Sequence, residues 1–109
     1  MQVRYPINNA SMRFNRRLLV AYLIEHGVNT VPKLMQMTGW PNRSIQKLIL
    51  SLADMNVQIS FVGAKKNGQY QVTDWASLNK AWICQHVNTI CELSGLDHCR
   101  IAAILTQLS

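Results

Sequence analysis

The sequence predicts an α+β fold that is mostly helical, with three helices, a β-hairpin and two further helices. Two observations predict this class. Apolar residues recur at helical spacing on both sides of residues 57–73, whereas inside that range they alternate with polar residues as in a half-buried strand. At 109 residues the chain can build one hydrophobic core but not two, so we expect a single domain over residues 1–109.

The first helix is expected to run from Ser11 or Asn15 to His26. Residues 1–10 would form an arm before it. Gly27 can supply the positive φ that ends many helices. Apolar residues lie on several faces of this segment, which is typical of a helix at the centre of a core.

A tight helix-turn-helix follows the first helix. The Thr30 hydroxyl can cap the second helix, which we expect to end at Thr38. Gly39 permits the positive φ that a sharp turn between two helices requires. Pro41 has its φ preset and favours a third helix, which would run to about Met55 and end where Asn56 can take a left-handed conformation. The inward face of this helix carries apolar residues at helical spacing, namely Ile45, Leu48, Ile49 and Leu52.

A β-hairpin is predicted after the third helix. Asn67-Gly68 is the strongest short hairpin signal in the chain, because both residues accept positive φ in a two-residue type I′ turn. That turn would pair Val62 with Thr73. One face of the hairpin would be polar, and the other would pack on the helices through Phe61, Tyr70 and Val72.

Two helices are expected after the hairpin. Asp74 can cap a fourth helix from Trp75 to about Leu93, which Gly95 would close, and Asp97 can cap a last helix. Both carry an apolar stripe, formed by Trp75, Trp82, Val87, Ile90 and Leu93 on one and by Ile101, Ile104, Leu105 and Leu108 on the other. Such stripes usually mark an interface, which favours a homodimer joined by this helical pair. The alternative is that both helices fold back onto the first helix and leave a monomer.

The positive charge is concentrated in one part of the chain. Residues 1–73 carry nine Lys and Arg against two acidic residues, a net charge of +7. Residues 74–109 carry two basic and three acidic residues, a net charge of −1. A polyanionic partner would therefore meet the first part, not the C-terminal part.

Residues 11–74 resemble the winged helix-turn-helix domains of bacterial transcription regulators. The resemblance is carried by Leu34, Met35, Gly39, Ile45 and Leu48, and by Asn67-Gly68 in the hairpin, or wing. The whole chain is similar to short uncharacterised bacterial proteins of this fold with extra C-terminal helices. The resemblance divides the domain into two parts. Residues 11–74 would form the winged helix-turn-helix, and residues 75–109 would form a helical pair for dimerisation.

The resemblance implies sequence-specific binding of double-stranded DNA and a role in transcription regulation. The helix after Gly39 would enter the major groove, where bases and backbone would be contacted by Asn42, Arg43, Ser44, Gln46 and Lys47. Lys65 and Lys66 near the wing tip would lie on the phosphate backbone. Arg13, Arg16 and Arg17 are candidates for further phosphate contacts, or form the solvated side of the first helix. Pro41 replaces the commoner Ser or Thr cap, so one phosphate-binding hydroxyl is missing.

A different interpretation is a winged-helix protein–protein interaction module without DNA binding. An enzyme is not expected, because the five carboxylates are scattered singly and the chain has no glycine-rich phosphate loop. Three cysteines, an odd count without the spacing of a disulfide scaffold, are typical of a reducing compartment. With no secretory signal and no apolar run of about 18 residues, we expect a cytoplasmic protein with no membrane partner.

A possible set of metal ligands is formed by Cys84, Cys91 and Cys99 with His86 and His98, but their spacing argues against a metal site. Cys84 and Cys91 are seven residues apart, so on one helix about 10 Å of rise would separate them, too far for one tetrahedral ion. His98 and Cys99 are adjacent, unlike the ligands of zinc sites. Ordinary buried thiols are favoured and a thiol redox sensor is the alternative, so we expect no metal and no cofactor.

Overall fold

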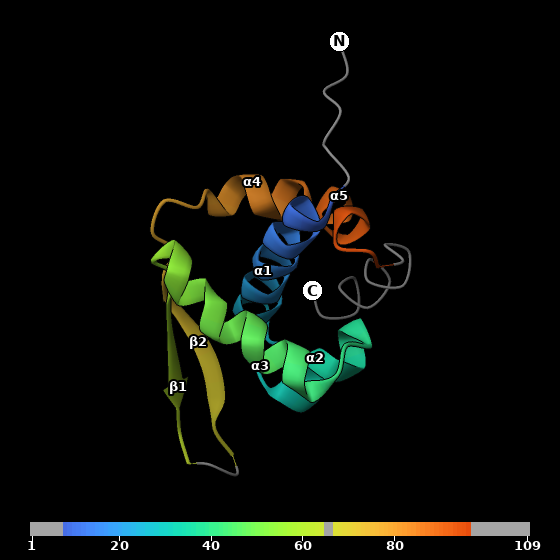
Figure 1. Cartoon of the computed structure of the whole chain (residues 1–109). Helices are drawn as coiled ribbons and strands as arrows, with labels where there is room; N and C mark the ends of the chain where they lie inside the picture. Colours follow the sequence, from blue (N-terminus) through green and yellow to red (C-terminus); the bar gives the residue numbers. More distant parts are fainter. Residues whose placement is uncertain (1–7, 65–66, 97–109) are drawn as a thin grey trace.

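The computed structural model describes residues 8–64 and 67–96. In chain order the elements are α1 (Asn9–Glu25), α2 (Val31–Thr38), α3 (Asn42–Ser51), the 3₁₀ helix η1 (Leu52–Met55), β1 (Gln58–Val62), β2 (Gln69–Asp74), α4 (Lys80–Gln85) and α5 (Val87–Leu93). Figure 1 shows α1 in the middle, with α4 and α5 above it and the other elements below and beside it. The expected class is confirmed: a mostly helical α+β fold with a hairpin and two C-terminal helices.

Helix α1 is the centre of the core, as its many-sided apolar pattern predicts. Every residue from 18 to 24 is buried, and α3, α5 and β2 pack against the helix. The helix begins at Asn9, earlier than expected, because the Asn8 side chain caps it and accepts a hydrogen bond of 2.8 Å from the Ser11 backbone N–H. Gly27 follows its end at φ 97°, as expected.

The turn between α2 and α3 is built as the sequence predicts. The Thr30 hydroxyl caps α2 and accepts a hydrogen bond from the Lys33 backbone N–H. Gly39 takes φ 77°, in the left-handed region. The Thr38 hydroxyl donates to the Leu34 carbonyl over 2.7 Å and accepts from the Trp40 backbone N–H over 3.1 Å. These bonds fix the direction in which α3 leaves the turn.

Helix α3 is shorter than expected. It ends at Ser51, and the 3₁₀ helix η1 carries the chain on to Met55. Asn56, at φ 64°, then closes this segment in the left-handed region, as expected. The inward face of α3 and η1 is buried through Ile45, Ile49 and Leu52, while Leu48 is partly buried.

The hairpin forms, but its expected pairing is wrong. Val62 pairs with Gln69 rather than with Thr73, so β2 is displaced by four residues along β1. Because four is an even number, Phe61, Tyr70 and Val72 keep their predicted face, although the register shifts again between Gln58 and Ile59. Ile59, Phe61, Tyr70 and Val72 share one side of the sheet, as their pairing shows.

Contacts made by Phe61 and Tyr70 explain the pairing. The two rings meet edge to face at 5.0 Å, and the Tyr70 backbone N–H donates to the Asn29 carbonyl over 2.7 Å. Phe61 also covers Gly68, where an added Cβ would lie 2.2 Å from the Phe61 ring. The aromatic pair therefore sets the register in place of the local Asn67-Gly68 turn signal.

The expected fourth helix from Trp75 to Leu93 is also wrong, because the chain forms two short helices there. The Asp74 carboxylate does not cap a helix but accepts a hydrogen bond from the Ala76 backbone N–H in a turn where Ala76 takes φ 54°. The cap is instead Asn79, whose side chain accepts from the Trp82 backbone N–H.

A break at His86 separates α4 from α5. His86 has φ −115° and ψ 21°, outside the helical range, and its ring stacks on Trp82 with 4.2 Å between ring centroids. Helix α5 is followed by Gly95 at φ 83°, as expected. The last helix, expected after Asp97, lies outside the described residues.

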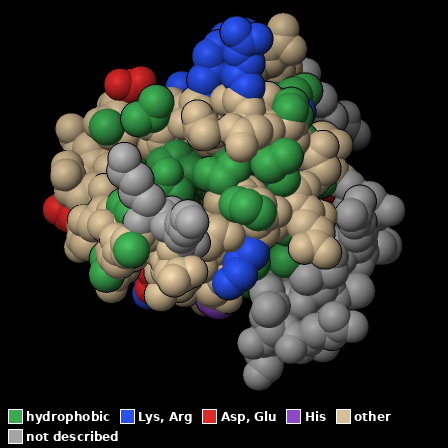
Figure 2. Space-filling model, turned by 90° about the horizontal axis from the view of Figure 1, so that it is seen from below, with side chains coloured by type: hydrophobic (Ala, Val, Ile, Leu, Met, Phe, Trp, Pro, Cys, Tyr) green, Lys and Arg blue, Asp and Glu red, His purple; other side chains and the backbone are tan. Residues whose placement is uncertain are grey.

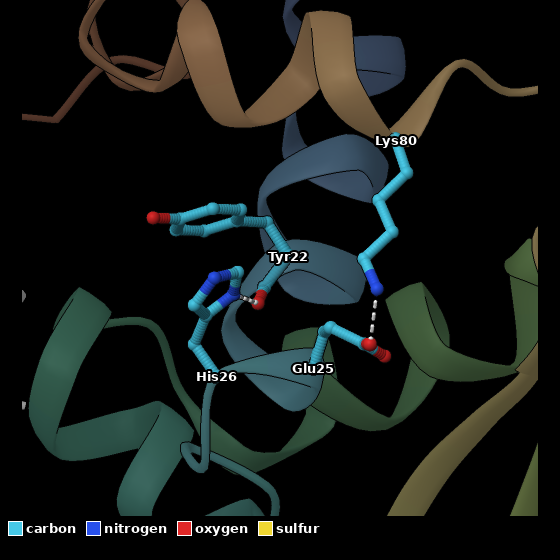
Figure 3. A network of polar contacts seen from close by, with 4 residues as sticks. All are labelled: Tyr22, Glu25, His26 and Lys80. Carbon is cyan, nitrogen blue, oxygen red and sulfur yellow. Dashed lines mark hydrogen bonds and ion pairs between the residues drawn. The ribbon is translucent and has the colours of Figure 1, made fainter. Parts of the chain in front are cut away.

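Helix α4 is tied to the end of α1 by an ion pair (Figure 3). The Lys80 ammonium lies 2.6 Å from the Glu25 carboxylate, and this hydrogen bond, with the attraction between the charges, raises the pKa of Lys80. Figure 3 also shows the His26 ring against Tyr22, with 4.2 Å between ring centroids. The C-terminal helices α4 and α5 thus pack back on α1.

None of the described helices has the length and apolar character needed to span a bilayer.

Candidate nucleic-acid interface

Helix α3 presents one continuous row of side chains to solvent, which we call the α3 stripe. Its members are Arg43, Gln46, Lys47 and Leu50: Gln46 and Lys47 follow Arg43 by three and four residues, and Leu50 follows them by four and three. All four are exposed, because the opposite face of α3 is held in the core. Of the other expected α3 residues, Asn42 is exposed and Ser44 is half-buried.

The start of α3 has the character that the sequence predicts. Pro41 occupies the cap position and makes no side-chain hydrogen bond to the first turn. The first backbone N–H groups of a helix have no partner within the helix and carry a partial positive charge. This end of α3 therefore favours an anionic group such as a phosphate.

Two adjacent arginines of α1 hold the two ends of α3. Arg16 places its guanidinium over the Trp40 ring, 4.7 Å from the centroid, just before α3 begins. Arg17 donates from Nε to the Ser51 hydroxyl over 3.0 Å at the end of α3. Ser51 in turn donates to the Leu48 carbonyl over 2.8 Å. These contacts fix the helix that carries the stripe.

The three candidate arginines of α1 therefore differ in their surroundings. Arg13 is exposed, whereas Arg16 and Arg17 are half-buried and engaged within the protein. The partners of Arg16 and Arg17 lie far away along the chain, in Ser94 and Ser51. The wing lysines, Lys65 and Lys66, lie outside the described residues.

An apolar groove separates α3 from the hairpin, and we call it the α3–hairpin groove. It encloses about 360 Å³ and is lined by Gln46, Ile49, Leu50, Ala53, Val57, Gln58, Ile59, Phe61 and Tyr70. Leu50 has 75% of its surface exposed and Phe61 47%. Figure 2 looks at the molecule from below, where hydrophobic side chains gather in the middle of the face, with Lys and Arg side chains above and below them and acidic side chains at the left edge.

Leu50 was missed as a candidate residue. The sequence does contain a signal for it, because Leu50 follows Gln46 by four residues and Arg43 by seven. This spacing places it on the solvent side of the helix, away from the inward row of Ile45, Ile49 and Leu52. An apolar residue among polar ones on the exposed face of this helix is itself a signal of a contact surface.

The described cysteines lie apart from α3. Cys91 is buried as expected, whereas Cys84 is exposed, so the expectation of a buried thiol is wrong for Cys84. Burial, and then the charge of Glu92, raises the pKa of Cys91 to about 11, so this thiol stays protonated at neutral pH. Within residues 8–64 and 67–96, no group of three or more His, Cys, Asp or Glu side chains could hold a metal ion. Cys99 and His98 lie outside those ranges.

Comparison with known proteins agrees with this geometry. A DUF2131 family protein from Shewanella amazonensis, known from a crystal structure, is 28% identical in sequence and superposes with a TM-score of 0.77. The match covers 84% of this chain and 92% of that protein. No curated protein sequence matches the chain significantly. The family of winged helix-turn-helix proteins matches residues 9–93, from the start of α1 to the end of α5. The chain therefore belongs to the winged helix-turn-helix family.

Proposed function

We propose that this protein binds double-stranded DNA with sequence specificity and regulates transcription in the bacterial cytoplasm. The observation that carries the proposal is the α3 stripe. The helix that follows the Gly39 turn exposes Arg43, Gln46 and Lys47 in one row, and the family to which the chain belongs suggests DNA binding. Winged helix-turn-helix domains are typically not enzymes, in agreement with a binding role.

The chemistry of the stripe suits the major groove. An arginine at position 43 can donate two parallel hydrogen bonds to O6 and N7 of guanine, and a glutamine at position 46 can bond N6 and N7 of adenine. Asn42, Ser44 and Lys47 are of the types that contact phosphates and fix the register of the protein on the duplex. Base reading and positioning would thus come from one helix.

Phosphate contacts outside α3 are assigned by charge and exposure. We assign Lys65 and Lys66 of the wing and the exposed Arg13 of α1 to the phosphate backbone. Arg16 and Arg17 use their Nε groups within the protein. A guanidinium carries five N–H donors, so the remaining donors of Arg16 and Arg17 can still reach a phosphate. Phosphate contacts by these two arginines therefore stay a prediction.

We also propose that the protein acts as a homodimer through residues 75–109. Two copies related by a two-fold axis would read two half-sites about 34 Å apart, one turn of the duplex. One member of the expected stripe of residues 75–93 is used within the protein, because Ile90 is buried in the core. The proposed interface therefore relies on the partly exposed members of that stripe, Trp75, Trp82, Val87 and Leu93, and on residues 97–109.

Salt-dependent binding to random duplex DNA tests the proposal. We expect micromolar binding that weakens steeply as salt is raised, because each phosphate contact releases counterions. The double variant Arg43→Ala with Lys47→Ala should bind less tightly and show a flatter salt slope. Lys80→Ala is the control, because it also removes a positive charge but does so in α4, outside the α3 stripe. This variant should bind as the native protein does. Equal binding by all three proteins would refute the α3 assignment.

A protein–protein interaction module is the second candidate function. The α3–hairpin groove favours it, because exposed apolar surface of this kind often receives a partner. A module of that type would show no salt-dependent affinity for duplex DNA. The same titration therefore separates the two functions.

A further inference from the structure

We propose that Leu50 determines specificity by contacting the C5-methyl groups of thymines in the major groove. This inference rests on the proposed DNA binding and adds a base preference to it. The observation behind it is that Leu50, with 75% of its surface exposed, stands in the same row as Arg43, Gln46 and Lys47.

The spacing along α3 fits consecutive base pairs. Leu50 follows Arg43 by seven residues, which corresponds to about 10 Å of helical rise. Base pairs follow one another every 3.4 Å along a duplex, so the row spans about three base steps. A helix lying along the groove would place Leu50 a few base pairs from the one that Arg43 reads.

Leu50 remains largely uncovered within the described fold. Its neighbour Ile49 turns into the core and is buried, whereas Leu50 lines the α3–hairpin groove beside Gln46 and Ala53. Covering a leucine is favourable in proportion to the area removed from water. A bound partner that covers Leu50 would therefore gain affinity from it.

The charges beside Leu50 favour a duplex over an apolar peptide as this partner. Arg43 lies on the same row two turns before Leu50, Lys47 lies one turn before it, and both are exposed. Gln46 belongs both to that row and to the wall of the groove, so the apolar surface is continuous with the proposed DNA interface. Asp54, exposed one turn beyond Leu50, would repel phosphates and marks the end of this interface.

Within a duplex, the thymine methyl is the group that suits Leu50. Phosphates and the polar base edges would lose water against a leucine without gaining a hydrogen bond. The C5-methyl of thymine is the apolar feature of the major groove, and aliphatic side chains contact it. Selected binding sites should therefore contain thymine at one or two fixed positions.

Replacing thymine by deoxyuridine tests the proposal, because the two differ only in the methyl group. The probe is the tightest duplex selected from a random library, with each thymine replaced in turn and Kd measured by fluorescence anisotropy. For the native protein we expect about a fourfold weaker Kd at one or two positions, the effect of uncovering one methyl-sized group. For Leu50→Ala we expect the same Kd for thymine and deoxyuridine at those positions.

Val62→Ala is the matched control. Val62 is also an exposed aliphatic residue, 49% exposed, but it lies on the polar face of the hairpin with Gln69. This variant should keep the full sensitivity to deoxyuridine. Thermal unfolding of both variants would establish that they are folded.

The possible results separate this inference from the proposed function. If no duplex binds, both are wrong. If a duplex binds and no thymine position responds to deoxyuridine, DNA binding stands and the role of Leu50 is overturned. The role is also overturned if Leu50→Ala keeps the response, because another residue would then contact the methyl group.

Discussion

The guanidinium of Arg16 lies over the indole of Trp40, 4.7 Å from the ring centroid, while its Nε donates to the Ser94 carbonyl over 3.0 Å. One side chain of α1 thus connects the turn before α3 with the end of α5. An added Cβ at Gly95 would lie 3.6 Å from the same guanidinium. The C-terminal helices and the proposed DNA-binding helix therefore share an anchor.

Removing this anchor should lower stability. We expect Arg16→Ala to reduce the free energy of unfolding by about 1–3 kcal/mol, through the lost ring contact and the lost charge-assisted hydrogen bond. Urea denaturation measures the change. Arg13→Ala is the control, since it removes the same side chain from an exposed position of α1 and should change stability by no more than about 0.5 kcal/mol. Equal effects of both substitutions would contradict an anchoring role.

Base reading by α3 should be visible in the sequence preference. We expect Arg43→Ala and Gln46→Ala each to weaken binding to the preferred duplex by about 1–3 kcal/mol and to relax the preference at one base pair. Selection from a random duplex library, repeated with each variant, measures both effects. An unchanged preference in both variants would remove base reading from the proposed function.

The wing should contribute affinity without preference. We expect Lys65→Ala combined with Lys66→Ala to weaken binding to all duplexes about equally, because phosphates carry no direct sequence information. The slope of affinity against salt should flatten by about one unit for each lost contact. Binding that stays at full strength in moderate salt would show that the wing does not lie on DNA.

The elements that the sequence predicts well are those with local signals. Thr30, Gly39 and Asn56 each act within a few residues of their own position, and all three take the expected role. The exposed side of α3 was equally predictable, because the inward row of Ile45 and Ile49 fixes which side faces solvent.

Features that depend on distant partners were not predictable. The hairpin register follows from Phe61 against Tyr70 and from the bond to Asn29, which outweigh the Asn67-Gly68 turn signal. Asp74 and Asn79 have equivalent capping chemistry, so the sequence alone could not place the start of α4. The partners of Arg16 and Arg17 lie 78 and 34 residues away along the chain.

The proposed dimer depends on the part of the chain after α5. Within the described residues, α4 and α5 pack on α1, and Ile83, Ile90 and Cys91 are buried there. These side chains therefore belong to the core of one copy. The apolar residues left to join two copies are the partly exposed ones of α4 and α5, together with those expected after Asp97.

Light scattering at micromolar concentration tests this assembly. A mass near twice 12.4 kDa would support the dimer, and a mass near 12.4 kDa would show that the protein is a monomer. If the dimer forms, Leu105→Asp should split it, because a carboxylate is costly in an apolar interface. That variant should also bind a two-half-site duplex less tightly while keeping its affinity for a single half-site, since every proposed DNA contact is intact. Loss of binding to both duplexes would instead indicate that residue 105 supports the fold of one copy.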